Sequence, residues 1–201
     1  MNQRIQLINI DENPIILFNK WFEEAKQTEI NDPNAMNLAT VASDQSPRSR
    51  IVLLKYYDEF GFVFYTNLES VKANNIRENQ KVALNFHWKS LTRQVRIVGL
   101  ADLVKNKEAD KYFDSRPENS RIGAWASKQS SELKKREELL EKVNDYKKKF
   151  EGKKILRPPN WSGYRVVPNL IEFWQEMPFR LHDRVEFNIS EKGWRGRRLY
   201  P

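Results

Sequence analysis

The stretch LTRQVRIVGLADLV (residues 91–104) decides the fold class, because apolar and polar side chains alternate along it with the period of a β-strand. One face carries Val95, Ile97, Gly99, Ala101 and Leu103. The opposite face carries Gln94, Arg96 and Asp102. This alternation predicts a strand with one buried and one open face, which is typical of an antiparallel sheet.

Short β-branched and aromatic runs extend this pattern on both sides. Upstream lie AMNLATVA, RSRIVLLKYY, GFVFYTN and KVALNFHW, and near the C-terminus lie YRVVP, LIEFWQ, RVEFNI and WRGRRLYP. Five strands, a helical insert and three or four further strands predict a mainly β protein of the α+β class. We expect a small antiparallel β-barrel with helices packed outside it.

Helical patterns precede, interrupt and follow the first group of strands. The first is ENPIILFNKWFEEAKQ, with Asn13 as cap and Pro14 in the first turn. A short helix is expected at SVKANNIREN with Ser70 as cap, two more at NKEADKYFDS and SRIGAWAS, and a long one over residues 130–150. The chain is therefore divided into an N-terminal arm and helix (residues 1–30) and a single barrel domain (residues 31–201).

The composition excludes several kinds of chemistry. The 201 residues include no cysteine and only two histidines, His87 and His182, so disulfide scaffolds, thiolate nucleophiles and multi-histidine metal centres are excluded. The seven glycines form neither GxGxxG nor GxxxxGK[ST]. No apolar run reaches the length of about 20 residues that a membrane span needs, and the N-terminus has no signal-peptide pattern, so we expect a cytoplasmic protein with no bound metal.

The net charge of +8 and the sequence pI of about 9.6 favour anionic partners. Residues 128–157 contribute much of the excess, with eleven Lys or Arg against six Asp or Glu. A solvated helix face explains such a run more simply than a binding patch. A nucleic-acid-binding barrel is nevertheless a second candidate, because aromatic and basic residues are both abundant.

Four segments place cations where anions could bind. In RIVLLK, Arg50 and Lys55 bracket an apolar strand, which fits an anion site or the charged ends of an edge strand. In FYTNLESVKANNI, a strand ends at Thr66 and a helix begins with Lys72 in its first turn. This second arrangement fits a phosphate site or an ordinary capped helix.

The other two segments lie further along the chain. In KYFDSRPENS, Tyr112, Arg116 and Ser120 could bind a phosphate monoester, although an arginine at a helix C-terminus is a common structural feature. In FWQEMPFRLHDR, two arginines and a carboxylate surround His182. That crowding favours a functional histidine over the structural role that a lone histidine usually has. His87 is expected in the core or at the barrel rim.

These segments occur together, and in the same order, in one known family. The chain resembles the pyridoxamine/pyridoxine 5′-phosphate oxidases, which are FMN-dependent enzymes. The resemblance runs from about residue 31 to 201 and rests on NDPNAM, RIVLLKYYDEFGFVFYTN, TRQVRIVG, KYFDSRP, IGAWASKQSS, IEFWQ, RLHDR and the terminal W…RRLYP. RLHDR with the C-terminal Arg-Leu-x-Pro is the most specific part.

The resemblance implies an FMN-binding split β-barrel that forms a homodimer with FMN at the subunit interface. The FMN-binding residues that it implies are Arg50, Ile51, Val52, Leu53, Lys55, Tyr65, Thr66, Lys72, Gln94, Gln129, Ser130, Trp174 and Arg184. The substrate phosphate would meet Lys55, Tyr112, Arg116 and Ser120. Arg180, Leu181 and His182 would hold the substrate ring, with Arg180 and His182 as the catalytic residues and Asp32 nearby.

The implied reaction is the oxidation of pyridoxamine or pyridoxine 5′-phosphate to pyridoxal 5′-phosphate, with O2 reduced to hydrogen peroxide. A related split-barrel FMN protein with another substrate is the first alternative. Two positions depart from the family pattern. Val71-Lys72 stands where an Arg-Lys pair is usual, and the N-terminal MNQRIQL has only Arg4 where the family often has an Arg-x-Glu-Tyr stretch. We therefore expect weaker FMN binding and a changed closure of the site.

Overall fold

The computed structural model describes residues 7–201, so the prediction about Arg4 lies outside the described residues. The strands are β1 (Ala35–Val41), β2 (Pro47–Leu53), β3 (Tyr56–Asp58), β4 (Gly61–Asn67), β5 (Lys81–Trp88), β6 (Arg93–Leu103), β7 (Trp161–Gln175), β8 (Asp183–Ser190) and β9 (Gly193–Leu199). The helices are α1 (Pro14–Thr28), α2 (Val71–Glu78), α3 (Asn106–Ser115), α4 (Glu118–Ala126) and α5 (Arg136–Phe150). A 3-10 turn covers Pro178–Arg180.

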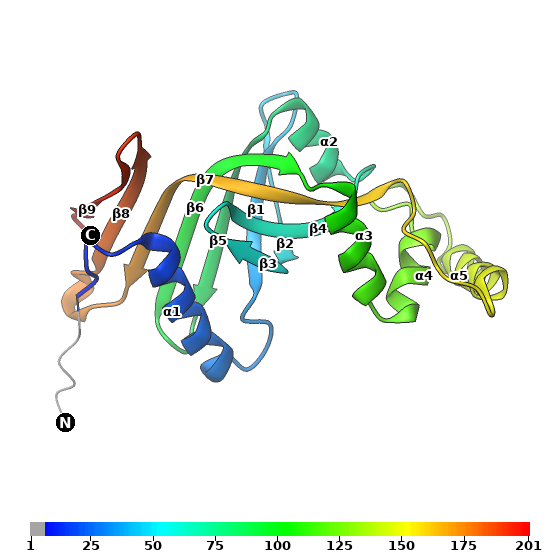
Figure 1. Ribbon diagram of the computed structural model, residues 1–201, viewed down its shortest axis with the longest axis horizontal. Helices are drawn as coiled ribbons and strands as arrows, with labels where there is room; N and C mark the ends of the chain where they lie inside the picture. Colours follow the sequence, from blue (N-terminus) through cyan, green and yellow to red (C-terminus); the bar gives the residue numbers. More distant parts are fainter. Residues whose placement is uncertain (1–6) are drawn as a thin grey trace.

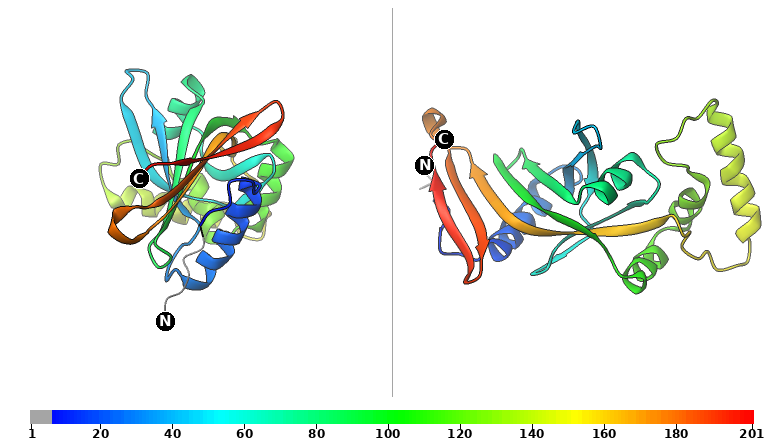
Figure 2. Two further views of the ribbon diagram at one scale, coloured as in Figure 1. Left: turned by 90° about the vertical axis from the view of Figure 1, so that its left-hand side faces the viewer. Right: turned by 90° about the horizontal axis from the view of Figure 1, so that it is seen from above.

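All strand pairs are antiparallel, and the sheet runs in the order β2-β1-β5-β6-β7-β4-β3. The long strand β7 splits the barrel, because one of its edges pairs with β4 over its first half and with β8 over its second half. The hairpin of β8 and β9 therefore extends from one end of the molecule, and α3, α4 and α5 form the other end (Figures 1 and 2). The predicted antiparallel barrel with peripheral helices is confirmed.

The concave face of the sheet forms the core, and α1 packs against it. Asn13 caps α1 as predicted, since its side-chain oxygen accepts the N–H groups of Ile15 and Ile16. Phe18 of α1 is fully buried and contacts the rings of Phe22, Tyr57, Phe62, Phe86 and Trp88. The N-terminal helix and the barrel strands thus share one hydrophobic core.

The predicted alternation in β6 is correct for four of its five apolar positions. Val95, Ile97, Gly99 and Ala101 are buried, whereas Leu103 is 59% exposed. Leu103 is the last residue of the strand. Ile189, near the end of β8, is 47% exposed, and His87 lies on the open face of β5 rather than in the core.

Two strand boundaries differ from the prediction. RSRIVLLKYY forms β2 and β3 instead of one strand, because pairing with β1 ends at Leu53 and the Lys55 N–H donates to Val63 of β4. YRVVP and LIEFWQ form the single strand β7 in spite of Pro168. Pro168 lies beside a register shift between Val98 and Gly99, where a residue without an N–H donor costs the ladder little.

One helix start and the bonding of one cap residue also differ from the prediction. The last predicted helix, α5, begins at Arg136 rather than near residue 130, so Leu133 precedes it. Ser70 occupies the cap position of α2 as predicted, but its hydroxyl donates to the Asn67 carbonyl instead of accepting from the helix.

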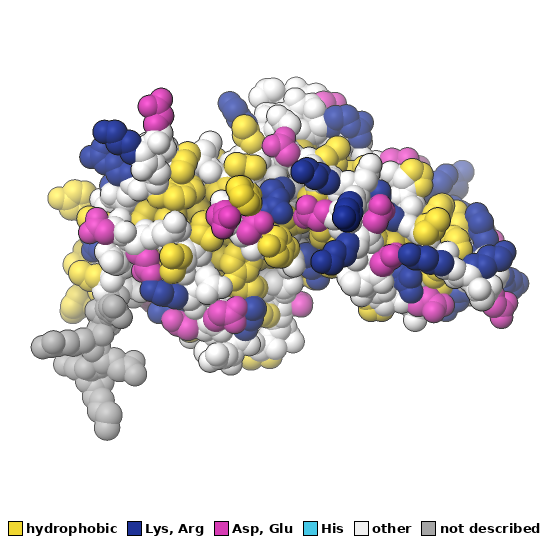
Figure 3. Space-filling model, in the orientation of Figure 1, with side chains coloured by type: hydrophobic (Ala, Val, Ile, Leu, Met, Phe, Trp, Pro, Cys, Tyr) yellow, Lys and Arg dark blue, Asp and Glu magenta, His cyan; other side chains and the backbone are white. Residues whose placement is uncertain are grey.

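Lys and Arg side chains gather over the α3–α5 end (Figure 3). None of the helices within residues 7–201 is long and apolar enough to cross a membrane.

Candidate active site

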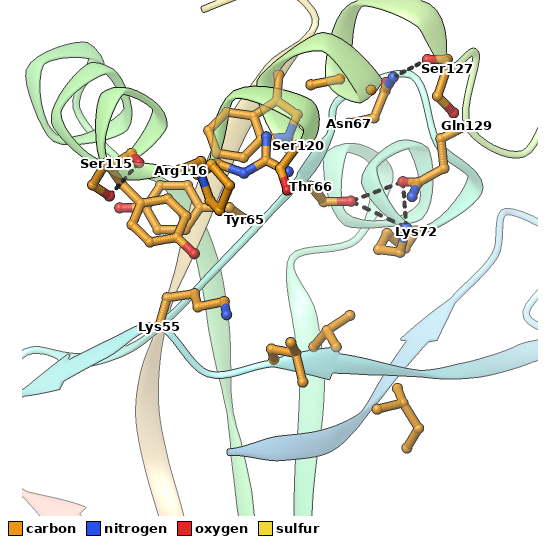
Figure 4. Close-up of a pocket in the computed structure, with 18 residues that line it drawn as sticks. Lys55, Tyr65, Thr66, Asn67, Lys72, Ser115, Arg116, Ser120, Ser127 and Gln129 are labelled. Carbon is orange, nitrogen blue, oxygen red and sulfur yellow. Dashed lines mark hydrogen bonds between the residues drawn. The ribbon is translucent and has the colours of Figure 1, made fainter. Parts of the chain in front are cut away.

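A cavity of about 710 Å³ lies between the sheet and helices α2, α3 and α4 (Figure 4). Three of its lining residues are cationic, Lys55, Lys72 and Arg116, and none of the described lining residues is acidic. The following predicted site residues line it: Ile51, Val52, Leu53, Lys55, Tyr65, Thr66, Lys72, Tyr112, Arg116, Ser120 and Gln129. Residues separated by up to 78 positions in the sequence therefore form one positively charged cavity.

The turn between β4 and α2 places Lys72 in this cavity. Asn67, the last residue of β4, accepts the Glu69 N–H at its side-chain oxygen (2.7 Å) and the Ser70 hydroxyl at its carbonyl (2.7 Å). These two bonds fix the turn just before the first helical residue. Helix α2 consequently begins with its N-terminus and Lys72 next to Thr66, an arrangement that favours anions.

Lys72 makes contacts only with neutral oxygen atoms among its described partners. Its ammonium lies 2.9 Å from the Gln129 amide oxygen, 3.2 Å from the Thr66 hydroxyl and 3.3 Å from the Ser70 hydroxyl. Burial and, to a smaller extent, the positive charge of Arg50 lower the pKa of Lys72 to about 8. A half-buried ammonium without a carboxylate partner is energetically costly, and a bound anion would relieve that cost.

Arg50 of β2 lies behind this group rather than on the cavity wall. Its guanidinium donates to the Leu38 carbonyl (3.0 Å) and the Thr40 hydroxyl (2.8 Å). Burial lowers the pKa of Arg50, and the Arg48 charge adds to the effect. Arg50 therefore contributes positive potential near Lys72 while its own hydrogen bonds are made within the sheet.

A second cationic group lies across the cavity, near Lys55 (Figure 4). Arg116 caps the C-terminus of α3, and its guanidinium lies 4.8 Å from the centre of the Trp161 ring. The Nη1 atom of Arg116 is buried and has no hydrogen-bond partner within residues 7–201. Burial also lowers the pKa of Arg116. A buried donor without a partner in a cavity wall is the feature expected of an anion-binding arginine.

Aromatic rings support this group. Tyr65 stacks on Tyr112 with the ring centres 4.0 Å apart, and on Trp161 at 5.3 Å. Burial is the main cause that raises the pKa of Tyr65 to about 12, and burial likewise raises the pKa of Tyr112. Both hydroxyls therefore remain protonated at neutral pH and can donate hydrogen bonds.

Three further predicted residues, Gln94, Trp174 and Arg184, lie together on the open face of the sheet and form a second group with the turn between β7 and β8. Gln94 of β6 pairs in register with Trp174 of β7, which pairs with Arg184 of β8. The Arg184 Nε donates to the Glu172 carboxylate at 2.9 Å, and Arg96 donates to the other oxygen of that carboxylate. Glu172 is only 2% exposed, so it holds both arginines against the sheet.

Arg180, Leu181 and His182 lie in the turn between β7 and β8. The His182 ring lies 4.6 Å from the Trp174 ring, and its Nδ1 accepts the Met177 N–H at 3.3 Å. Phe179 and Arg180 both have positive φ angles, 59° and 62°. Such left-handed backbone at two successive non-glycine residues is strained, and strain of this kind concentrates at functional sites.

Within one chain the two groups do not meet. None of the second group lines the main cavity, and Leu181 and His182 line a separate one next to the C-terminus. Ser130 follows Gln129 with a positive φ of 70° but does not line the main cavity, and neither does Asp32. A single subunit therefore brings together only part of the predicted site.

The sequence interpretation missed seven residues of the main cavity, which are Asn67, Ser115, Pro117, Gly123, Ala124, Ser127 and Trp161. Trp161 follows the Pro158-Pro159 pair at the start of β7 and pairs in register with Asn67 of β4. The only sequence signal was an aromatic residue directly after a helix-breaking segment. Its contact with Arg116, 45 residues earlier, arises from tertiary packing.

The split antiparallel barrel and its cationic cavity define the class of protein, a split-barrel protein of the α+β class with a positively charged cavity beside the sheet. The comparisons with known proteins give the family. Residues 22–149 match the family model described as "Pyridoxamine 5′-phosphate oxidase", and residues 161–201 match "Pyridoxine 5′-phosphate oxidase C-terminal dimerisation region". The chain belongs to the pyridoxamine 5′-phosphate oxidase family.

Relatives that are named pyridoxine/pyridoxamine 5′-phosphate oxidase match nearly the whole chain. The protein of Bartonella quintana is 50% identical over 207 residues, which cover 100% of both chains. The protein of Caulobacter vibrioides is 52% identical over 191 residues, which cover 95% of this chain and 86% of that protein. The family assignment therefore rests on full-length similarity.

Solved structures support the fold. PhzG from Burkholderia lata, in complex with tetrahydrophenazine-1-carboxylic acid, is 29% identical with a TM-score of 0.91, covering 98% of both chains. A pyridoxamine 5′-phosphate oxidase-related, FMN-binding protein from Nostoc punctiforme superposes with a TM-score of 0.76 at 14% identity, covering 95% of this chain and 100% of that one.

Proposed function

We propose that this protein is an FMN-dependent oxidase that converts pyridoxamine 5′-phosphate, pyridoxine 5′-phosphate or both to pyridoxal 5′-phosphate. The main observation in favour is a cavity whose described lining residues include three cations and no acid, divided into a Lys72 group and an Arg116 group. Two separate cationic groups suit a cofactor phosphate and a substrate phosphate in one cavity. Relatives at about half identity carry the corresponding name.

The Lys72 group fits the FMN phosphate. Its ammonium, the Thr66 hydroxyl and the N-terminus of α2 converge without a carboxylate among the described neighbours. We assign FMN binding to the thirteen residues that the family resemblance implies, with Gln94, Trp174 and Arg184 contributed by the partner subunit. When bound, FMN supplies the two-electron acceptor for oxidation of the exocyclic carbon of the substrate.

The Arg116 group is assigned to the substrate phosphate. Arg116 has a buried donor without a partner, and Tyr112 and Ser120 bring hydroxyls to the same wall. Lys55 lines the same cavity near this group and adds a second positive charge there (Figure 4). These side chains bind and orient the substrate, so its reacting carbon is positioned without further ordering.

Arg180, Leu181 and His182 complete the site from the second subunit of a homodimer. They belong to residues 161–201, the segment that matches a dimerisation region. In the proposed dimer this turn lies over the partner's cavity, where Arg180 orients the substrate ring and His182 helps to hold it or to move a proton. O2 takes up the two electrons and becomes hydrogen peroxide, and pyridoxamine phosphate additionally takes up water and releases ammonia.

An absorption spectrum tests the proposal directly. We expect the purified protein to be yellow, or to become yellow with added FMN, and the flavin band to bleach when pyridoxamine 5′-phosphate is added without oxygen. Readmission of air should restore the band with one hydrogen peroxide per pyridoxal 5′-phosphate. A protein that flavin cannot reconstitute, or a band that neither substrate bleaches, contradicts the proposal. Light scattering should give about twice 24.0 kDa.

The PhzG match supports a second candidate, a split-barrel flavin oxidase with another substrate. The two candidates differ in the role of the Arg116 group. A phosphorylated pyridine needs it, whereas a ring compound that carries only a carboxylate leaves most of these donors without a partner. Bleaching by tetrahydrophenazine-1-carboxylic acid but not by pyridoxamine 5′-phosphate would favour the second candidate.

A further inference from the structure

Arg116 is held in the cavity wall by aromatic rings rather than by a carboxylate. Its guanidinium lies 4.8 Å from the ring centre of Trp161 and 5.7 Å from that of Phe113. No acidic side chain forms an ion pair with Arg116 among the described residues. A guanidinium that rests on a ring keeps its charge unneutralised, and its donors remain free for an incoming anion.

The Trp161 ring is itself fixed from several sides. It is 7% exposed, lies parallel to Tyr65 with 7° between the ring planes, and makes a T-shaped contact with Phe113, with the ring centres 5.1 Å apart. Its carbonyl accepts a 2.7 Å hydrogen bond from Arg157, whose Nε donates to Asp110 of α3 at 2.6 Å. The start of β7 is thereby connected to the helix that ends at Arg116.

We propose that Trp161 is a positioning residue for the substrate phosphate, acting through Arg116. The ring supports one face of the guanidinium in the cavity wall, and the buried Nη1 donor of that guanidinium has no partner among the described residues. Without the ring, Arg116 can turn toward solvent and must be reordered each time an anion binds. The inference rests on the proposed function, since it names the residue that sets the phosphate affinity of that site.

Inorganic phosphate is the probe. It is titrated by isothermal titration calorimetry into the purified protein, and FMN is added to saturation if the protein binds FMN. Replacing the ring in Trp161→Leu should weaken phosphate binding about tenfold, the size of a partly desolvated cation–π contact. Trp161→Phe keeps a smaller ring and should lose about threefold. Trp125→Leu is the matched control, because Trp125 belongs to the same aromatic cluster but does not line the cavity. It should bind phosphate as the unchanged protein does.

A double-mutant cycle separates positioning from a general loss of structure. If Trp161 acts through Arg116, then Trp161→Leu should weaken phosphate binding strongly in the unchanged protein and by less than twofold in an Arg116→Ala background. Equal losses in both backgrounds, or an equal loss in Trp125→Leu, overturn the proposal. If Trp161→Leu does not fold, the same cycle is run with Trp161→Phe, and phosphate binding unchanged by that substitution also overturns it.

Turnover provides a second readout. In an active enzyme, Trp161→Leu should raise the KM for pyridoxamine 5′-phosphate about as much as it weakens phosphate binding, with kcat changed less than twofold. A contact that stabilises the bound substrate and the transition state equally changes KM and not kcat when it is removed. A fall in kcat at unchanged KM overturns the positioning role. If no substrate is oxidised at all, the proposed function fails, and the phosphate titrations still decide the role of Trp161.

Discussion

Lys72 and Gln129, 57 residues apart in the sequence, are joined by a 2.9 Å hydrogen bond from the lysine ammonium to the glutamine amide oxygen at the wall of the main cavity. The pair connects the first turn of α2 to the loop after α4. A charged donor is thereby held by a neutral acceptor, which an anion can readily replace or supplement.

Flavin binding should depend on the protonation of Lys72. Because the pKa of Lys72 is lowered to about 8, part of the population is neutral at pH 8–9, and binding of the FMN phosphate should draw a proton onto it. We expect FMN affinity to fall as the pH rises from 7 to 9, with proton uptake on binding. Calorimetry near pH 8.5 in buffers of different ionisation enthalpy measures that uptake.

Lys72→Met is the variant that isolates this effect. This variant should bind FMN more weakly at pH 7 and should lose most of the proton uptake, whereas Lys89→Met on an exposed turn should change neither property. Proton uptake by Lys72→Met as large as that of the unchanged protein would contradict the assignment.

The lowered pKa of Lys72 also affects the stability of the flavin-free protein. Between pH 8 and 10.5 the unfolded chain binds the Lys72 proton that the folded chain releases, so this group raises stability with pH in that window.

Glu172 should be important for stability as well as for the site. Its carboxylate is 2% exposed and accepts from both Arg96 and Arg184. Glu172→Gln keeps the size but removes the charge, so we expect a loss of about 1–3 kcal/mol in the free energy of unfolding. Urea denaturation measures it, with Glu191→Gln on the exposed β8–β9 turn as control. A loss no larger than that of the control would show that the two arginines need no buried carboxylate.

Phe18 should be the most costly single truncation in α1. Its ring is fully buried between the helix and the sheet, so Phe18→Ala should destabilise the protein by about 3–5 kcal/mol. Ile16 lies two residues earlier on the same helix and is 54% exposed. Ile16→Ala is therefore the matched control and should change the free energy of unfolding by less than about 0.5 kcal/mol. Similar effects at the two positions would refute the packing of α1 described above.

Two glycine substitutions should have opposite signs. A Cβ at Gly99 would lie 2.2 Å from the Val167 carbonyl oxygen, which belongs to the backbone of β7. We expect Gly99→Ala to destabilise the protein by about 1–3 kcal/mol. Gly123 in α4 has open space around that position, so Gly123→Ala should stabilise the flavin-free protein by about 0.5–1 kcal/mol. Thermal unfolding of both variants without flavin provides the test.

Arg180 should matter for turnover and not for flavin retention. Arg180→Ala should lower kcat/KM about 100-fold, since a misplaced substrate loses much of the benefit of orientation. The flavin spectrum and the FMN stoichiometry should remain those of the unchanged protein. Loss of FMN from the variant would instead make Arg180 part of the cofactor site.

The fold could be predicted from the sequence because, in a strand with one buried face, an apolar residue recurs at every second position. Val95, Ile97 and Ala101 show this repeat, and all three are buried. The predicted α1 cap at Asn13 is equally local, since the cap residue and the N–H groups it accepts lie within three positions. The single strand β7 was not predicted, because its central Pro168 normally ends a strand and only the register shift opposite it permits continuation.

By itself the sequence determined which side chains could carry the chemistry: no cysteine, few histidines, and cations at strand ends and helix starts, together with a family resemblance. Only the tertiary structure decided which of them meet. Lys72, Thr66 and Gln129 converge, Arg116 rests on Trp161, and Arg180 lies with His182 at the other end of β7. The physical reason is that secondary structure follows from contacts between near neighbours in the chain, whereas a binding site follows from the path of a sheet that brings distant segments together.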